Sequence, residues 1–310
     1  MTSKLPTSGD YTPPSGKIII AKQDDPSVLR FLVAQRKLYS QSKRWLGLRL
    51  IGMGVIGIAA PLATLHWQNT AVTVGAVAGT WVFLGRTAFI IFEKRLSARA
   101  AAVQEIFDTE LFGMSSLGER SPTASLEEIA VLVGPDAEIM EVARREKLLG
   151  WYAINPVAGG LVSVAICQRT NAAYSSDLLK VMAKTWLTAI GLWGVLLVAL
   201  SLILHFSLST FLLGILLPLL PAFLDTFEYW KGIKRASVDR ASLSREIQEK
   251  IETNDVTGED LLVWQSRMYE LRRDAPQVPD FLYRLMRSGN ERTMKSVATQ
   301  LSNKIRRSKR

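Results

Sequence analysis

The sequence has a single cysteine, Cys167, and only two histidines, His66 and His205. One cysteine cannot form an internal disulfide, and it offers no thiolate pair for a metal ion. The two histidines stand far apart in the chain, without the spacing of a metal-binding motif. The sequence therefore predicts no disulfide framework, no metal site and no cofactor.

Acidic residues are missing from two long stretches. None occurs between Asp25 and Glu93 or between Asp177 and Asp225, and both stretches are strongly apolar. The net charge of +10 comes mainly from the rest of the chain, where basic residues are in excess. Such an excess suits a surface that faces anionic lipid headgroups, a nucleotide or a nucleic acid.

The first residues lack the apolar core of a signal peptide. Residues 1–16 are rich in Pro, Ser, Thr and Gly, and we expect a flexible tail over residues 1–24. Asp25 followed by Pro26 is typical of a helix start. An amphipathic lead-in helix is therefore expected at 25–44, with Lys43 and Arg44 at the lipid headgroups.

Four segments are apolar and long enough to cross a bilayer as helices, which takes about 20 residues each. They cover about 45–65, 71–92, 181–204 and 208–224, and short connections at 66–70 and 205–207 join them into two hairpins. A soluble helical protein is the alternative interpretation. It is disfavoured because a soluble core helix carries a polar stripe, which residues 187–204 lack.

Basic residues give the orientation of these crossings. Residues 1–44 hold eight Lys and Arg, residues 93–184 hold ten and residues 225–310 hold eighteen, whereas the two connections hold none. The positive-inside rule places both chain ends in the cytoplasm. The predicted fold is an all-α membrane protein with four transmembrane helices in two hairpins, and with helical cytoplasmic segments between the hairpins and after the last helix. The expected divisions are 1–24, 25–44, 45–92, 93–180, 181–224 and 225–310.

Several residues inside the expected crossings have two possible roles. Gly75 and Gly79 belong either to a face used for oligomerisation or pore formation, or to the ordinary packing within one four-helix unit. Pro218 and Pro221 should kink the last crossing, as a gate or as a static bend. Arg86 is costly inside lipid unless it snorkels to the headgroups or lines a pore.

The charged segments predict further helices. Ala-rich sequence extends the second crossing as a stalk over 96–112, and Ser125 with Glu128 forms a capping-box pattern for a helix at 125–133. Residues 150–174 mix Gly, Pro, aromatic and polar types and should be the least regular part. After the last crossing we expect a long charged helix, a break at 253–255, helices at 258–273 and 280–305, and a basic end at 304–310.

Motifs of catalysis are absent from the sequence. It has no glycine-rich phosphate loop, nucleophile elbow, paired-histidine zinc motif or paired-cysteine zinc motif. The expected crossings also lack the charged relay residues of proton-coupled transporters. We therefore expect a protein that is not an enzyme.

Four short motifs carry a resemblance to a known family. They are QRKLYS at 35–40, VQEIFD through LF at 103–112, ICQRTN at 166–171 and VPDFLY at 278–283. In this order and with two hairpins, the chain resembles the SMODS-associated four-transmembrane effector family. The likeness covers about residues 25–300.

The resemblance implies a membrane effector of bacterial anti-phage defence (CBASS), in which a cyclic oligonucleotide activates a pore or other damage to the inner membrane, leading to abortive infection. It also implies a homo-oligomer when active and an ion channel as one form of the damage. The implied ligand-binding residues are Gln35, Arg36, Gln168, Arg169, Asn171 and Tyr283, to which Arg272 and Arg273 are added for their nearby charge. Two alternatives stay open: these side chains staple the cytoplasmic helices together, and the protein is a membrane-anchored scaffold or sensor without a pore.

Overall fold

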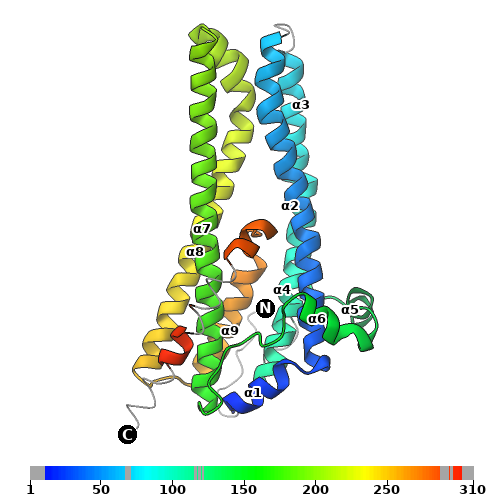
Figure 1. The fold of residues 1–310 in the computed structure, drawn as a ribbon, viewed down its shortest axis with the longest axis vertical. Coiled ribbons are helices and arrows are strands. Elements are labelled where there is room, and N and C mark those ends of the chain that lie inside the picture. The colour runs from blue at the N-terminus through cyan, green and yellow to red at the C-terminus, as the bar shows by residue number, and fades with distance from the viewer. Residues whose placement is uncertain are drawn as a thin grey trace, which may run out of the picture.

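The computed structural model describes residues 11–66, 71–114, 122–286 and 296–301, together with Leu117, Arg120 and Thr293. Over these residues the chain is helical and forms no strand. Figure 1 shows an elongated molecule whose long axis is followed by α2 (Pro26–His66), α7 (Gly160–Ile203), α8 (Leu217–Glu252) and α3 (Ala71–Leu84) with the helices that continue it. We call residues 45–66, 71–92 and 181–224 the apolar bundle, and the remaining described residues the basal half.

The apolar bundle exposes its apolar side chains instead of burying them. The most apolar stretches of the helix Val72–Phe112 and of α7 have mean hydropathies of 1.6 and 2.2, yet only 11% and 6% of them is buried. Large side chains such as Ile51, Val72 and Leu196 are exposed. Water disfavours an apolar surface of this extent, whereas lipid is a natural solvent for it. The structure therefore favours a membrane protein over a soluble helical one.

The described residues support part of the expected four crossings. Val72–Phe112 and Gly160–Ile203 are long and apolar enough to cross a membrane, and a third span results if Thr210–Leu216 and Leu219–Glu252 form one bent crossing. The crossing expected at 45–65 includes positions 60–62, 64 and 65, whose side chains lie outside the described part, as do residues 67–70 of the first connection. Two or three spans are thus supported by the described residues.

The last expected crossing is bent, as its prolines predict. Thr210–Leu216 is a π-helix, and it meets Leu219–Glu252 at an angle of 60°. A proline causes such a bend because it removes a backbone donor and crowds the preceding turn. A second π-helix, η3 (Gly85–Phe89), joins α3 to α4 (Ile90–Phe112).

Several predicted helix ends are confirmed. The α2 helix begins at Pro26, where the Asp25 carboxylate accepts hydrogen bonds from the backbone N–H and the hydroxyl of Ser27. The α5 helix (Leu126–Val133) begins with the predicted capping box, and α9 (Gly258–Arg273) has the predicted bounds. The α4 helix, predicted as a stalk, ends at Gly113, whose φ of 70° is the left-handed conformation that glycine adopts readily.

Two expectations about the basal half are wrong. Residues 16–23, placed in a flexible tail, form helix α1 (Gly16–Gln23), because Ile19 is fully buried and anchors it. Residues 160–174, expected to be irregular, are the first part of α7. Their Gly and aromatic residues obscured a helix that is buried on all sides from Ser163 to Gln168. The basic end at 304–310 lies outside the described residues.

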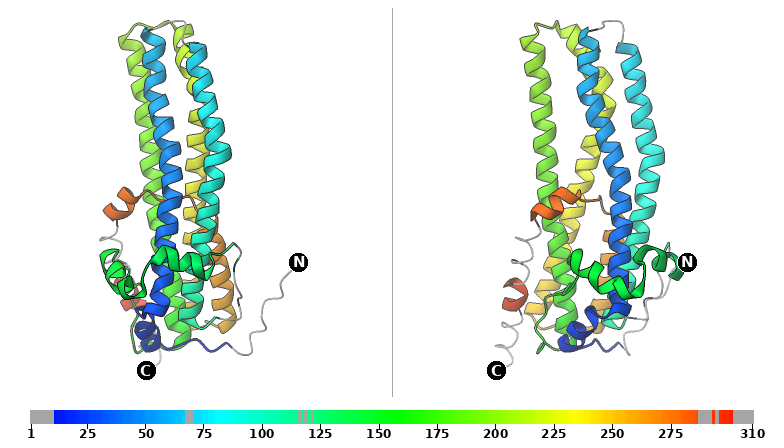
Figure 2. Two further views of the ribbon diagram at one scale, coloured as in Figure 1. Left: turned by 90° about the vertical axis from the view of Figure 1, so that its right-hand side faces the viewer. Right: turned by 45° about the vertical axis from the view of Figure 1, so that its right-hand side comes forward.

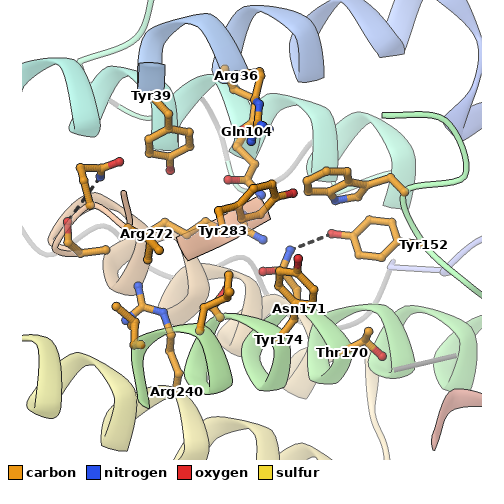
Figure 3. Close-up of a pocket in the computed structure, with 18 of the residues that line it drawn as sticks. Arg36, Tyr39, Gln104, Tyr152, Thr170, Asn171, Tyr174, Arg240, Arg272 and Tyr283 are labelled. Carbon is orange, nitrogen blue, oxygen red and sulfur yellow. Dashed lines mark hydrogen bonds between the residues drawn. The ribbon is translucent and has the colours of Figure 1, made fainter. Parts of the chain in front are cut away.

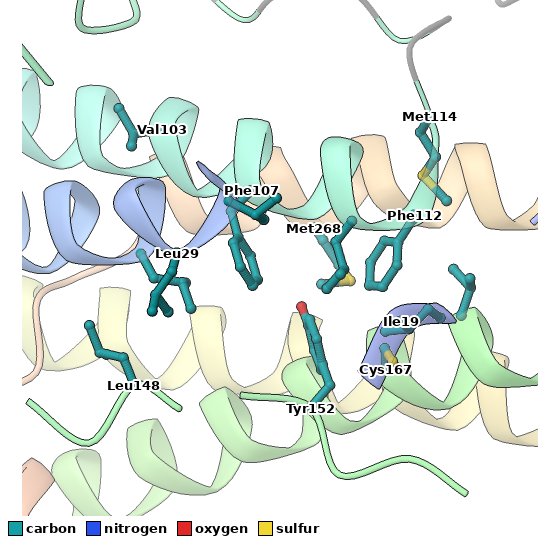
Figure 4. Close-up of a cluster of buried hydrophobic side chains, with 14 of the residues drawn as sticks. Ile19, Leu29, Val103, Phe107, Phe112, Met114, Leu148, Tyr152, Cys167 and Met268 are labelled. Atoms are coloured by element: carbon teal, nitrogen blue, oxygen red, sulfur yellow. The ribbon is translucent and has the colours of Figure 1, made fainter. Parts of the chain in front are cut away.

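The main hydrophobic core lies in the basal half and joins α1, α2, α4 to α9 and the loops between them. The elements not yet given are the short helices η5 (Asp136–Glu138) and α6 (Ile139–Arg145). Figure 4 shows Phe107, Phe112, Tyr152, Cys167 and Met268 meeting at its centre. The views in Figure 2 show α1, α5, α6 and α9 packed around the basal ends of the long helices. This core fixes the elements that surround the cavity described next.

Candidate functional site

The basal half encloses a cavity of about 400 Å³. Its lining comes from α2, α4, α7, α8, the end of α9 and the segments 147–153 and 275–283. A volume of this size is typical of small-molecule sites. Five of the eight predicted ligand-binding residues line it, and Figure 3 labels four of them. The five are Gln35, Arg36, Asn171, Arg272 and Tyr283.

The lining is cationic. It includes Arg36, Lys43, Lys147, Arg240 and Arg272, while the described residues that line the cavity include no carboxylate. Cationic and amide donors converging on one space are the arrangement that phosphate groups require. The geometry therefore fits an anionic ligand.

The charge of Arg272 is compensated by carboxylates of the protein itself. Its Nη1 lies 2.6 Å from Asp108 Oδ2 and 3.6 Å from Glu105 Oε2, and all three side chains are buried. A buried ion pair of this kind is costly to break, since the remaining partner would be left uncompensated. Arg272 thus joins α9 to α4, and its first role is structural.

Arg240 is the cation without an acidic partner. Only 4% of the residue is exposed, and its guanidinium donates to the carbonyl oxygens of Ala236 and Leu271. Among the described residues no carboxylate lies within the 4.0 Å of an ion pair with it. Burial lowers the pKa of Arg240 to about 10, which leaves it protonated at neutral pH. A buried charge that faces a cavity and has no carboxylate partner favours the binding of an anion there.

The sequence analysis missed Arg240, although a signal for it exists. Leu243, Ile247 and Ile251 form the buried stripe of α8, and Arg240 precedes Leu243 by one turn on the same face. A cation on an apolar stripe must find a partner or a ligand. That pattern separates Arg240 from the exposed basic residues of the same helix.

Two cations of the cavity lining already contact other side chains of the protein. Arg36 lies over the Tyr283 ring, with Cζ 4.8 Å from the ring centre, and its Nε is 3.7 Å from Glu146 Oε2. Lys43 Nζ is 2.6 Å from Asp280 Oδ1, and its side chain is largely buried. Burial lowers the pKa of Lys43, and its hydrogen bond to Asp280 partly offsets this shift.

Aromatic rings supply the rest of the lining. Tyr39, Trp151, Tyr152, Tyr174 and Tyr283 all border the cavity, and Figure 3 shows the four tyrosines around one space. Nucleobases stack on such rings with little dependence on their identity. Burial raises the pKa of Tyr39 to about 12, so its hydroxyl stays protonated and can donate a hydrogen bond.

A hydrogen-bonded chain holds one wall of the cavity. Asn171 Nδ2 donates to the Tyr152 hydroxyl over 3.3 Å, and that hydroxyl donates to Asp108 Oδ1 over 2.7 Å. The Tyr152 backbone N–H donates to Gln23 Oε1 over 2.8 Å. Through this chain, α1, α4, α7 and the segment 147–153 are fixed relative to one another.

Several buried polar atoms of the lining make no hydrogen bond within the described part of the chain, and two of them are Gln35 Oε1 and Thr170 Oγ1. Buried polar groups are nearly always satisfied. These two atoms are therefore candidates for direct contact with a ligand.

The other three predicted ligand-binding residues do not line the cavity. Gln168 is fully buried and donates to the Leu261 carbonyl oxygen and to Gln265 Oε1. Arg169 donates to Gln248 Oε1 over 3.0 Å, and Arg273 pairs with the adjacent Asp274. For Gln168 and Arg169 the contacts join α7 to α9 and α8 and agree with the stapling alternative, whereas Arg273 forms its ion pair with its chain neighbour.

The residues predicted inside the membrane have distinct surroundings. Arg86 does not stand alone: it pairs with Asp225 over 3.0 Å and with Glu228 over 2.9 Å, joining η3 to α8. Gly79 has open space where a side chain would begin, so its small size is not required by packing within this chain. The described residues contain no group of three potential metal ligands.

Comparisons with known proteins agree with the resemblance found in the sequence. The family model described as SMODS-associating 4TM effector domain matches residues 17–301. Neither the comparison with curated proteins nor that with solved structures gives a match. The matched range includes every element that surrounds the cavity.

Proposed function

We propose, from the premise that this chain belongs to the SMODS-associating 4TM effector family, that it is a bacterial defence effector activated at the basal cavity by a cyclic oligonucleotide. In this proposal the protein sits in the inner membrane with both chain ends in the cytoplasm. Its long helices then assemble into a pore or otherwise disrupt the bilayer.

The observation that carries the proposal is the buried Arg240, which has no carboxylate partner among the described residues, in a cavity lined by cations and aromatic rings. A cyclic oligonucleotide presents phosphates and stackable bases together. Arg240 and Arg36 suit the phosphates because a guanidinium binds phosphate oxygens in a bidentate manner. Tyr39, Trp151 and Tyr283 suit the bases.

Four crossings in two hairpins remain the topology that we propose. The exposed apolar faces of α2, α3, α7 and of residues 208–224 support it, as does the crowding of Lys and Arg into the basal half. One copy of four helices cannot enclose a wide channel, so a pore requires self-association. Gly79, with open space beside it, is available to such an interface.

The cavity is placed to control the helices. Its lining takes Gln35 and Arg36 from α2 but Asn171 from α7 and Arg240 from α8. A ligand held by both sets changes the relative stability of their arrangements, which is how binding shifts a conformational equilibrium. The Arg86 pairs with Asp225 and Glu228 join α8 to η3 at the edge of the apolar bundle, and any rearrangement must strain or break them.

The test of ligand binding uses protein in nanodiscs and a panel of fluorescent cyclic dinucleotides and trinucleotides. One member of the panel should bind, and Arg240→Met should weaken its binding by about 10- to 100-fold, the value of a lost charge-assisted hydrogen bond or two. The matched control is Arg245→Met on the exposed face of the same helix, which should leave binding unchanged. Equal loss in both variants, or tight binding by Arg240→Met, would contradict the site.

The test of membrane damage uses liposomes that contain only this protein and a trapped dye. The cyclic oligonucleotide that binds should release the dye, and Arg240→Met should release none at the same concentration. A tight seal with bound ligand favours the alternative function, a membrane-anchored sensor or scaffold. Under that alternative, replacing residues 45–92 and 181–224 with unrelated hairpins should preserve the phage protection that the native protein gives.

A further inference from the structure

Residues 280–286 form a short helix with one apolar side facing outward. Phe281 and Leu285 are 62% and 74% exposed, and their four-residue spacing places them on the same face. Leu282 is buried on the other face, in a cluster with Leu179, Met182 and Ile233. Two large exposed apolar side chains on one helical turn need a partner.

The contacts of this helix fix its level along the molecule. Lys43, which pairs with Asp280, lies two residues before the first expected crossing. Leu179 and Met182 stand at the start of the third, and Ile233 follows the end of the fourth. The short helix in Figure 1, drawn in orange, accordingly lies beside the base of the apolar bundle. Three separate crossings thus place it at the boundary between apolar and charged surface.

We infer that residues 280–286 lie along the lipid interface, with Phe281 and Leu285 inserted among the acyl chains. Lipid is the occupant because the apolar bundle next to this helix already exposes apolar surface on α7 and α8, including Leu187 and Leu224. Arg284 is exposed on the same helix, where a cation meets anionic headgroups favourably. The interface helix and the crossings then contact one continuous bilayer.

This placement gives the bilayer a direct contact with the wall of the cavity. Tyr283, between the buried Leu282 and the exposed Arg284, lines the cavity under Arg36. The segment that enters lipid is therefore the segment that supplies an aromatic wall to the site. The lipid contact itself does not depend on which ligand binds, or on whether a pore forms.

The experiment attaches an environment-sensitive NBD fluorophore to a cysteine at the chosen position. Cys167 is the only native cysteine and is buried, so the unchanged protein serves as the blank for labelling. Phe281→Cys and Leu285→Cys are labelled in nanodiscs of phosphatidylcholine and phosphatidylglycerol. Val131→Cys on α5, whose native side chain is 84% exposed, is the matched control. Thermal unfolding of each variant checks that it is folded.

Labels at 281 and 285 should emit at shorter wavelength than the label at 131. They should be quenched by nitroxides on the acyl chains and protected from aqueous iodide, with the reverse at 131. Quenching by iodide at 281 and 285 would overturn the inference. Protection from both quenchers would overturn it as well, because protein, such as a second copy, would then cover the helix. No messenger is added, so the result is independent of ligand binding.

Discussion

Replacing Arg272 with methionine should destabilise the basal half by about 3–5 kcal/mol, the cost of leaving a buried charge without its partner. Asp108 is fully buried, and its carboxylate lies 2.6 Å from Arg272. The lower end of the range applies, since Asp108 keeps the Tyr152 hydroxyl at 2.7 Å and Gln265 Nε2 at 3.3 Å. Burial is the main cause that raises the pKa of Glu105 to about 7, so this carboxylate can be protonated. Glu105 therefore adds little to the cost.

The assay is thermal unfolding in detergent at pH 7.5, at one scan rate. A loss of about 3 kcal/mol should lower the midpoint by roughly 6 °C, at about 2 °C per kcal/mol for a chain of this size. Arg273→Met is the control: its neighbour and partner Asp274 is largely exposed, so the midpoint should stay within about 1 °C. Adding Asp108→Asn to Arg272→Met should recover part of the loss. An unchanged midpoint in Arg272→Met, or an equal drop in Arg273→Met, would refute the assignment of Arg272 to the core.

Three further predictions follow from the same contacts. The pKa of Glu105 is raised to about 7 in the folded state, so the free energy of unfolding should fall by an amount on the order of 3 kcal/mol as pH rises from about 4.5 to about 7. Glu105→Gln should flatten this pH profile of the unfolding midpoint. An unchanged profile would contradict the raised pKa. Arg86→Gln removes the ion pairs between η3 and α8 and should raise dye release from liposomes without messenger, whereas a seal as tight as that of the native protein would exclude a restraining role. Gly52→Ala should cost about 1–3 kcal/mol, since an added Cβ would lie 1.9 Å from the Trp81 ring; Gly54→Ala, with open space beside it, should be nearly neutral in the same unfolding assay.

Local sequence signals predicted much of the helical framework. Pro26, the Ser125 capping box and the break before Gly258 act through neighbouring residues, so their effects can be derived without the fold. The α1 helix escaped prediction because its eight residues are held by the burial of Ile19 against distant segments. The start of α7 escaped for a similar reason: the side-chain nitrogens of its polar residues Gln168 and Asn171 donate to partners outside α7.

The cavity could be predicted in part. The motifs at 35–40, 166–171 and 278–283 do meet, and they contribute Gln35, Asn171 and Tyr283 to its lining. Sequence could not separate the residues that face the cavity from those that face the core, because positions 168 and 171 are one helical turn apart. Nor could it pair Arg272 with Asp108, since that contact depends on how α9 crosses α4. The sequence shows that Arg240 is charged, but only the structure shows that it has no carboxylate partner among the described residues.

The uninterrupted α7 helix has a mechanical consequence. It carries Thr170 and Asn171 near one end and continues without a break to Ile203, a distance of about 48 Å from Asn171 at 1.5 Å per residue. Such a rod has no joint at which a movement could be absorbed. A tilt of about 5° at the Asn171 end would swing the Ile203 end sideways by about 4 Å, by the same rise per residue. A displacement too small to change the cavity walls greatly is in this way multiplied at the opposite tip of the molecule.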